Sequence, residues 1–465
     1  MMSVKLSYRN ILRNRRRSAM TALAVAAGTQ ALLLFGGFQS YVFAGLESGA
    51  VQRSGHLTVY REGYFLYGAG NPVDYGIDRY PELIRLVRSD PVLHPLAEVV
   101  TPTLSLVGIA GNFSPTGSAA KTFLGVGFVP SDRARMRQWD EYGASSASQE
   151  VNLDDGDPST GFVGVGLGRI LGLCGRLRIA DCPPAPVSAP QRSAAGATPQ
   201  DFSYLQEPGD AANDAHALLP RLDLLAATAN GAPNVVSLYV KAASPQGVKE
   251  LDDNVIGMHL ALAQRLVYGR SEPKVTGLVI QLRRSEDLPL ARTRLQALFA
   301  EHHLPLDVRE FSELNPFYVQ VKRFFGSIFL FIALIMGVIV LFTIVNTMTM
   351  AVLERTTEVG TTRALGVKRR GVQRQFLLEG GMLGALGATA GVAVASLATL
   401  AINHAHLTWT PPGNAQPVPF HIALFGQPTL IAATWIALTS VATLAAWLPA
   451  NRAARLPIVD ALRHV

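Results

Sequence analysis

The chain of 465 residues is 49% hydrophobic and only 16% charged, which is too apolar for an ordinary pair of soluble domains. Its net charge of +7 is concentrated beside uncharged stretches, because residues 1–18 carry +6, residues 354–381 carry +3 and residues 449–465 carry +2. Basic clusters of this kind are typical of the cytoplasmic ends of membrane spans, and they argue against a nucleic-acid-binding surface.

Residues 1–17 predict an amphipathic helix on the inner membrane surface. Val4 and Ile11 lie on one helical face and Lys5 and Arg9 on another, a pattern held at an interface by apolar burial and anionic lipid. A basic start before an apolar stretch is also typical of a secretory signal peptide. The uncharged stretch 18–46 exceeds the usual signal core of about 7–15 residues, so we expect an uncleaved first span there.

Residues 47–315 predict a soluble α+β domain between the first and second spans. Stretches rich in β-forming residues predict four strands, at 55–60, 121–128, 234–242 and 274–284. Helical periodicity predicts three helices, at 81–90, 247–266 and 287–302. Residues 183–199 are rich in Pro, Ala and Ser and predict a flexible surface insertion. The sequence leaves open whether the domain has one lobe or two.

The two cysteines, Cys174 and Cys182, fall in this domain. If it lies in an oxidising compartment, a disulfide across the short loop is expected to contribute about 2.5 kcal/mol to stability. Two free buried thiols are the alternative.

The second span is expected within 316–353, after Lys322 and Arg323. Its 30 uncharged residues, 324–353, correspond to a helix of about 45 Å, longer than a hydrocarbon core of about 30 Å. We therefore expect this helix to tilt or to project from the membrane as a stalk.

The last uncharged run, 380–451, is too long for one span and must break at the proline-rich loop 403–428. This leaves a third span at 381–402 and a fourth at 429–448. The loop 403–428 contains no Lys or Arg, which places it outside. The tail 449–465 and both termini are then cytoplasmic. Four glycines are expected to let the third span pack closely on a neighbour: Gly380, Gly384, Gly387 and Gly391.

Residues 354–366, ERTTEVGTTRALG, form a short polar segment between two apolar runs. The positive charge around it predicts a cytoplasmic location, where it can contact a cytoplasmic partner and no external ligand. We expect a helix and loop over 354–380, with Glu358 and Arg363 offering opposite charges to the partner and Gly360 permitting close approach.

The pattern E-R-x-x-E-V-G-x-x-R-A-L-G resembles the coupling segment of the FtsX/MacB/LolE superfamily of ABC-transporter permeases. The nine matching residues are Glu354, Arg355, Glu358, Val359, Gly360, Arg363, Ala364, Leu365 and Gly366. The basic start RNILRNRRRSAMTAL and the ending PANRAARLPIVDALRHV are also similar to the family, and the resemblance covers about residues 1–60 and 310–465. It implies a MacB-like (type VII) membrane protein with four transmembrane α-helices and a large α+β extracytoplasmic domain between spans 1 and 2. It also implies a strand and a short amphipathic helix over 162–173.

The resemblance implies a non-catalytic permease subunit. Its coupling helix would be gripped by a dimer of cytoplasmic ABC ATPases, beside a second permease copy or a paralogue, in the bacterial inner membrane. ATP and magnesium would be bound by the ATPase, because the chain has no G-x-x-x-x-G-K-[ST] motif. ATP binding would pull two coupling helices together, and the spans would transmit the movement to the external domains.

The stretch GHLTVYREGY after the first span looks most like the LolC/LolE branch, which implies lipoprotein release, with a lipoprotein or a periplasmic adaptor as a further partner. MacB-like export and FtsX-like regulation of a cell-wall hydrolase are the alternatives.

Neither a metal site nor a catalytic site is expected. His302, His303, His404, His406 and His421 lack a carboxylate or thiol at ligand spacing, and the chain has no H-E-x-x-H or G-x-S-x-G motif. In the second span, Thr343, Asn346 and Thr347 are polar. We interpret them as residues that form hydrogen bonds between helices, and not as a translocation site. The spans lack the buried ionisable residues of a conduction path, so we expect the protein to transmit movement and not to form a pore.

Overall fold

The computed structural model describes residues 7, 9–10, 13–68, 72–114, 117–143, 153–179, 182, 216, 218–246, 249–410 and 417–457. These form two compact units. The helical unit comprises Met1–Ala44, Val319–Trp409 and Pro419–Val465, and the sheet unit comprises Gly45–Tyr318 and Thr410–Val418. Most of the expected interfacial helix 1–17, all of the insertion 183–199 and the tail from 458 lie outside the described residues.

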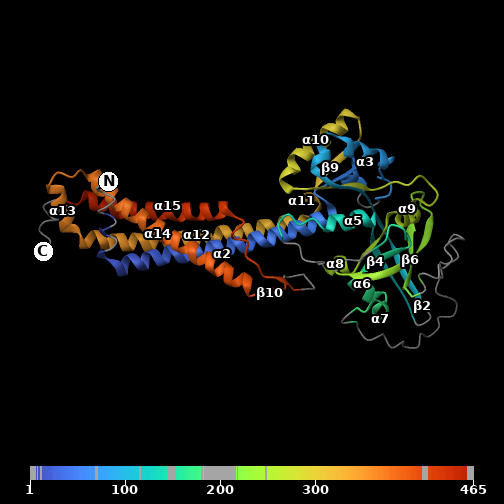
Figure 1. The fold of residues 1–465 in the computed structure, drawn as a ribbon, viewed down its shortest axis with the longest axis horizontal. Helices are drawn as coiled ribbons and strands as arrows, with labels where there is room; N and C mark the ends of the chain where they lie inside the picture. The colour runs from blue at the N-terminus through green and yellow to red at the C-terminus, as the bar shows by residue number, and fades with distance from the viewer. Residues whose placement is uncertain are drawn as a thin grey trace. The chain divides into compact units, whose positions relative to one another are not determined.

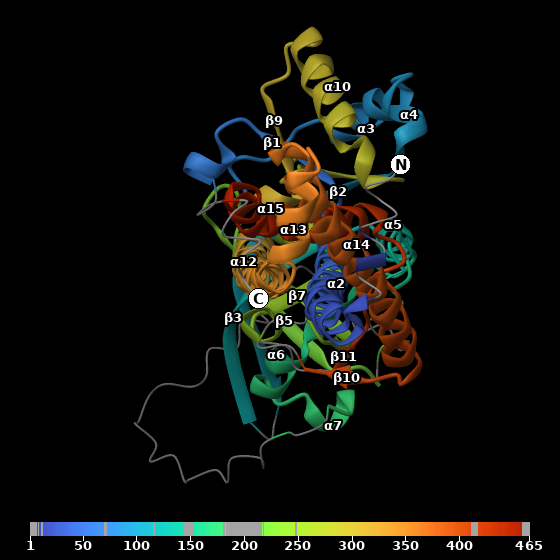
Figure 2. The same cartoon turned by 90° about the vertical axis from the view of Figure 1, so that its left-hand side faces the viewer.

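Among the described residues, the helical unit contains four helices that are long and apolar enough to cross a membrane. They are α2 (Arg15–Ser54), α12 (Pro316–Glu354), α14 (Arg369–His404) and α15 (Pro428–Arg455). Figures 1 and 2 show them beside one another, and side chains from all four share one apolar core. Short strands β10 (Thr408–Trp409) and β11 (Val418–Pro419) lie in the connection between α14 and α15.

These helices extend beyond the uncharged stretches from which spans were predicted. Residues 369–380, expected as part of a loop, form the first turns of α14, because Arg, Gln and Leu favour helix and continue directly into the apolar run. Similarly, α15 continues through Pro449 to Arg455, seven residues into the expected tail. The absence of charged residues marks the part of a helix that lies in the hydrocarbon region. The helical hydrogen bonding can continue beyond the edge of that region.

The four glycines of α14 lie at two helix contacts. A side chain at Gly380 or Gly384 would meet Ala446 or Ala442 of α15, at 2.5 Å in the second case. A Cβ at Gly387 would lie 2.7 Å from a backbone oxygen of α2, and one at Gly391 2.6 Å from another. Glycine therefore lets α14 pack against α15 with one turn and against α2 with the next.

One part of the sheet unit has the β-α-β-β-α-β order of a ferredoxin-like fold. Its four strands lie in the order β2-β8-β1-β9 and all pair antiparallel. The strands are β1 (Leu57–Arg61), β2 (Ala97–Ser114), β8 (Gly277–Leu282) and β9 (Leu306–Glu310). Helices α3 (Tyr80–Ser89), α4 (Leu93–Leu96) and α10 (Leu288–Glu301) supply the crossovers, with the single turns η1 (Tyr64–Gly68), η4 (Ser285–Asp287) and α11 (Phe311–Leu314) beside them.

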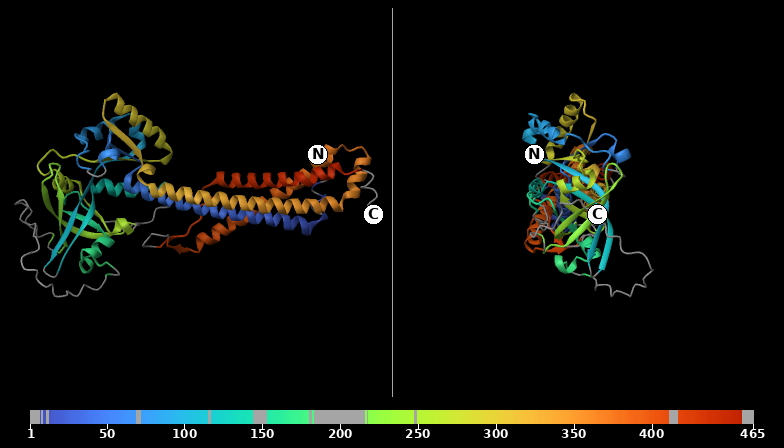
Figure 3. Two further views of the ribbon diagram at one scale, coloured as in Figure 1. Left: turned by 180° about the vertical axis from the view of Figure 1, so that it is seen from behind. Right: turned by 90° about the vertical axis from the view of Figure 1, so that its right-hand side faces the viewer.

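The other part is a closed, barrel-like ring of six strands inserted between β2 and β8 (Figure 3). The ring runs β2-β3-β7-β4-β6-β5 and returns to β2. Its other strands are β3 (Gly117–Phe128), β4 (Thr160–Gly164), β5 (Arg221–Ala227), β6 (Pro233–Ser244) and β7 (Val255–His259). Helices α5 (Pro130–Arg137), α6 (Val165–Ile170), α7 (Cys174–Leu177), α8 (Lys249–Asp252) and α9 (Leu260–Tyr268) complete it. The long strand β2 belongs to both parts, which gives the domain two lobes with one continuous apolar core.

Most of the elements predicted in this domain are confirmed. The four predicted strands correspond to β1, β3, β6 and β8, two of the predicted helices correspond to α3 and α10, and the strand and helix implied over 162–173 are β4 and α6. The predicted helix 247–266 is wrong, because its middle forms the buried strand β7. There Val255 pairs in parallel with Leu124 of β3, and this tertiary pairing outweighs the local helical pattern.

Candidate coupling site

The matched segment 354–366 contains the short helix α13 (Thr356–Ala364), which lies between the ends of α12 and α14 in Figure 1. Glu358 in its first turn and Arg363 in its last turn have the charges that favour the two ends of a helix dipole. Gly366 ends it with φ +95°, while the N–H of Gly366 bonds Arg363 O at 3.0 Å and the N–H of Val367 bonds Thr362 O at 3.3 Å. This is a Schellman closure, so the last glycine of the motif is needed to reverse the chain.

Arg355, which stands between α12 and α13, forms a buried ion pair with Glu379 of α14. The guanidinium Nη1 lies 3.3 Å from the carboxylate, and both side chains are only 5% exposed. A second nitrogen, Nη2, donates to the backbone oxygen of Asn10 at 3.2 Å. One side chain thus holds together the entry to α13, the start of α14 and the N-terminal segment.

The two acidic residues of the motif pair with the basic N-terminal end of the chain. Arg13 Nη2 donates to Glu358 at 2.7 Å, and Arg17 of α2 forms an ion pair with Glu354. The Arg13–Glu358 pair is more than half exposed on both sides, so its net contribution is about 0–1 kcal/mol. These two pairs connect α13 and the end of α12 to the first span.

The remaining motif residues divide into a buried and an exposed set. Val359 and Gly360 are buried, and Arg363 donates to the backbone oxygen of Leu456, just after α15. Ala364, Leu365 and Gly366 are exposed, with Leu365 at 82%.

Glu358 and Arg363 are therefore engaged within the chain, in contrast to the expectation that they present free charges to a partner. The free surface lies at the C-terminal end of α13, where Leu365 and Val367 are followed by the exposed cations Lys368, Arg369 and Arg370. We call residues 364–370 the α13 tip. No local pattern predicts that Arg13, Arg17 and Asn10 contact the motif, because these contacts join residues more than 300 positions apart.

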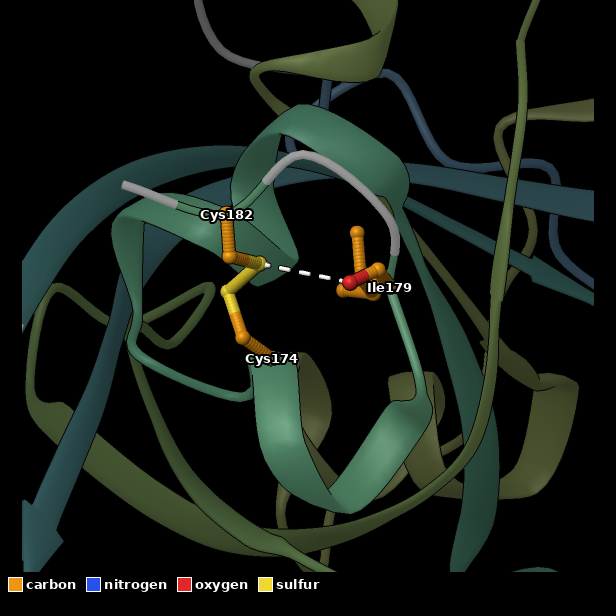
Figure 4. The surroundings of a disulfide bond; sticks show 3 residues. All are labelled: Cys174, Ile179 and Cys182. Atoms are coloured by element: carbon orange, nitrogen blue, oxygen red, sulfur yellow. Dashed lines mark hydrogen bonds between the residues drawn. A yellow bond between two sulfur atoms is a disulfide. The ribbon is translucent and has the colours of Figure 1, made fainter. Parts of the chain in front are cut away.

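Cys174 and Cys182 of the sheet unit are joined by a disulfide (Figure 4). Cys174 begins α7, its Cα lies 6.2 Å from that of Cys182, and the sulfur of Cys182 lies 3.6 Å from the backbone oxygen of Ile179. Within the residues that the structure describes, no group of His, Cys, Asp and Glu side chains is arranged to hold a metal ion.

Comparison with known proteins places the coupling site inside a recognised domain. Residues 329–458 match the family described as FtsX-like permease C-terminal. The chain is 32% identical over 159 residues to the ABC transporter permease YtrF of Bacillus subtilis, covering 33% of this chain and 35% of YtrF. It is 25% identical over 230 residues to the macrolide export ATP-binding/permease protein MacB of Neisseria meningitidis, covering 46% of this chain and 33% of MacB.

The matched segments thus span about a third of these relatives. A further relative, the uncharacterized ABC transporter permease YvrN of Bacillus subtilis, is 34% identical over 125 residues, which is 26% of each chain. The permease motif, the four apolar helices and these relatives agree: the chain is a multi-pass membrane protein whose residues 329–458 form an FtsX-like permease domain of the FtsX/MacB/LolE superfamily.

Proposed function

We propose that the chain is the permease subunit of an ABC transporter and that the α13 tip is where a separate dimer of cytoplasmic ATPases binds. The observation that carries this proposal is the set of contacts around α13. Arg355 connects to α14, and Glu354 connects to the first turn of α2. Glu358 connects to Arg13, just before α2, and Arg363 connects to the chain just after α15. A displacement of α13 is therefore transmitted to all four apolar helices, since α12 precedes it directly.

The contacts of α13 differ in strength, which is consistent with α13 moving relative to part of its surroundings. The exposed pair Arg13–Glu358 can rearrange at a cost of about 0–1 kcal/mol. Breaking the buried pair Arg355–Glu379 costs about 3–5 kcal/mol, because an unpaired charge would remain in a dry site. We expect α13 and the start of α14 to move as one body, while the contact with Arg13 adjusts. This is the mechanical coupling that a permease without its own ATP site requires, with ATP and magnesium held by the partner.

The basic residues around α13 support a location on the cytoplasmic side of a bacterial inner membrane, with both termini inside and the sheet unit outside. The disulfide Cys174–Cys182 supports an oxidising compartment for the sheet unit. In intact cells, an impermeant thiol reagent should label Leu218→Cys, because Leu218 is 96% exposed. It should label Lys368→Cys only after permeabilisation, and labelling of Lys368→Cys in intact cells would overturn this topology.

Two cargo classes follow from different observations. The stretch 55–64, GHLTVYREGY, favours release of lipoproteins, with a lipoprotein or a periplasmic adaptor at the sheet unit. The relatives named as macrolide export MacB proteins favour export of small molecules. Reconstitution with the ATPase distinguishes them, because a lipidated protein should stimulate ATP hydrolysis in the first case and a macrolide in the second. A hydrolase regulator should respond to neither.

The coupling proposal is tested by Leu365→Asp in the full chain. Leu365 is largely exposed, so the variant should fold, but a carboxylate at the centre of a docked apolar contact should weaken the ATPase complex by at least about tenfold. Leu218→Asp, the same substitution at an exposed leucine of the sheet unit, is the matched control. The measurement is co-purification with the ATPase that accompanies the wild-type chain in its native membranes. Unchanged association of Leu365→Asp would show that the α13 tip is not the docking site.

A further inference from the structure

Two of the apolar helices, α14 and α15, separate along their length. They are in close contact at one end, where a Cβ at Gly380 or Gly384 would lie 2.4 or 2.5 Å from a side-chain carbon of α15. The next two glycines of α14, Gly387 and Gly391, face α2 instead. Figures 1 and 3 show α14 and α15 diverging from this point toward the end of α14 that lies near β10.

A groove lies between the two helices where they diverge. Its volume is about 460 Å³, within the range of about 300–1,000 Å³ for pockets that hold a small ligand. Its apolar walls are formed by Val392 of α14 and by Ile431, Ala432, Trp435 and Ile436 of α15, with Thr389 and Pro428 beside them. None of these residues is charged. The groove opens on the exposed side of α15, because Ile436 is 58% exposed and Ala432 is exposed as well.

The two polar side chains of the groove are satisfied by the chain itself. Nε1 of Trp435 donates to Thr389 Oγ1 at 3.1 Å, and this hydroxyl donates to Ala385 O at 2.8 Å. Pro428 has no N–H to offer. The side chains of the groove therefore leave no free donor for a ligand. A hydrocarbon chain needs none, whereas a peptide or a sugar would lose its hydrogen bonds to water on entering such a site.

We propose that this groove binds one acyl chain of a bilayer phospholipid. Both walls belong to helices that are long and apolar enough to cross a membrane, and Trp435 lies about 10 Å along α15 from Pro428. A groove at this depth is surrounded by lipid tails, and an empty one would leave its walls without dispersion contacts. The surrounding bilayer supplies phospholipid chains in large excess over any lipidated cargo, so phospholipid is the occupant.

The bound chain would fill the space that the helices leave where glycine no longer brings them together. It would lie against Ile431, Trp435 and Ile436 and support the diverging part of α14 and α15. This inference depends on α14 and α15 spanning a membrane. It requires neither the ATPase at the α13 tip nor any cargo, so it can fail while the proposed function holds, and the reverse.

Quenching of tryptophan fluorescence by phospholipids with brominated acyl chains tests the site, because Trp435 lines it. In the full chain in vesicles, Trp409→Phe and Trp447→Phe leave Trp435 and Trp139 as the fluorescent residues. Trp139 is buried in the sheet unit, and its background is measured after Trp435→Phe is added. If Trp435 contacts one bound chain, its fluorescence should fall in direct proportion to the brominated fraction of the lipid.

The matched comparison is a chain with Trp409→Phe and Trp435→Phe, which keeps Trp447. Trp447 is 49% exposed on the same helix and lies outside the groove, so it contacts several bilayer chains. Any one of them can quench it, and its fluorescence should fall more steeply than in proportion at low brominated fractions. Curves of the same shape for Trp435 and Trp447 would contradict a single bound chain.

Filling the groove provides the second test. Ala432→Phe and Ala433→Phe place the same side chain at neighbouring exposed positions of α15, of which Ala432 lines the groove and Ala433 does not. Ala432→Phe should reduce the quenching of Trp435 by at least about half, because the groove would no longer have space for a chain. Ala433→Phe should leave it unchanged. Both variants add an apolar group to a lipid-exposed face, so neither is expected to unfold. Full quenching in Ala432→Phe would overturn the inference.

Two competitions identify the source of the chain. Brominated lipids with phosphoethanolamine and phosphoglycerol headgroups should quench Trp435 equally, because no charged residue lines the groove. Quenching by only one of them would contradict recognition through the acyl chain. A triacylated lipopeptide added as a small fraction of the lipid should not relieve the quenching. Relief would assign the groove to a lipidated cargo and reject phospholipid as its occupant.

Discussion

The buried pair of Arg355 and Glu379 gives the sharpest test of how α13 is held. In Arg355→Met, the carboxylate of Glu379 stays in a site where its side chain is 5% exposed, without the guanidinium 3.3 Å away. The backbone oxygen of Asn10 also loses its donor. Removing one member of a buried pair typically costs about 3–5 kcal/mol, which is a large share of a protein's net stability.

The comparison variants separate this effect from loss of charge in general. Arg13→Met removes an exposed pair to Glu358 and should cost less than about 1 kcal/mol. The double variant Arg355→Met, Glu379→Leu removes both buried charges and should recover to within about 1–2 kcal/mol of the wild type.

The assay is thermal unfolding of the purified full chain in detergent, together with ATPase stimulation in vesicles. Arg355→Met should lower the unfolding temperature by several degrees more than Arg13→Met, and the double variant should restore most of the loss. Two results would contradict the assignment of Arg355–Glu379 as a stabilising buried ion pair. In the first, Arg355→Met is as stable as Arg13→Met. In the second, the double variant is as unstable as Arg355→Met alone.

Three further predictions concern other parts of the chain. Gly384→Ala should destabilise by about 1–3 kcal/mol in thermal unfolding, because its Cβ would lie 2.5 Å from a side-chain carbon of α15, whereas Gly337→Ala, with open space around it, should be neutral or stabilising. Burial lowers the pKa of His56 to about 4. The unfolded state therefore binds more protons below about pH 6.5, so the stability of the sheet unit should fall by roughly 3 kcal/mol as pH drops from 6.5 to 4. In pH-dependent unfolding, His56→Gln should flatten this dependence, and an unchanged slope would contradict it. Unreduced digests should yield a linked peptide for Cys174 and Cys182, and reduction should cost about 2.5 kcal/mol; recovery of both thiols free after alkylation would refute the bond.

Several features of this protein follow from the sequence alone. Residues 324–353 and 380–451 contain no charged side chains. A hydrocarbon environment disfavours charge at each position independently, so this pattern can be read without knowing any tertiary contact. The excess of Lys and Arg at 1–18 and 354–381 is likewise a one-dimensional signal of orientation. The helix-ending role of Gly366 is also a local property. Its φ of +95° lies in the left-handed region, which glycine adopts without steric cost, so no tertiary contact is needed to explain it.

The sheet unit shows where local pattern ceases to be sufficient. Helical periodicity over 247–266 suggested one helix, but residues 255–259 pair in parallel with β3. The closure of six strands into a ring depends on β2 meeting both β3 and β5, contacts that join distant parts of the sequence. The strand that pairs with such a segment lies far away in the sequence, so the local sequence does not predict the segment's conformation.

The same distinction applies to the candidate site. The sequence alone identified the segment 354–366, but it did not show which charged group each of its side chains contacts. A carboxylate such as Glu358 is equally compatible with the local sequence whether it pairs with a partner protein or with its own chain. Tertiary structure brings Arg13 to Glu358 and Glu379 to Arg355, and it leaves Leu365 exposed. The apolar spans could be predicted from the composition of contiguous stretches, whereas the exposed surfaces depend on which side chains the tertiary structure has already paired.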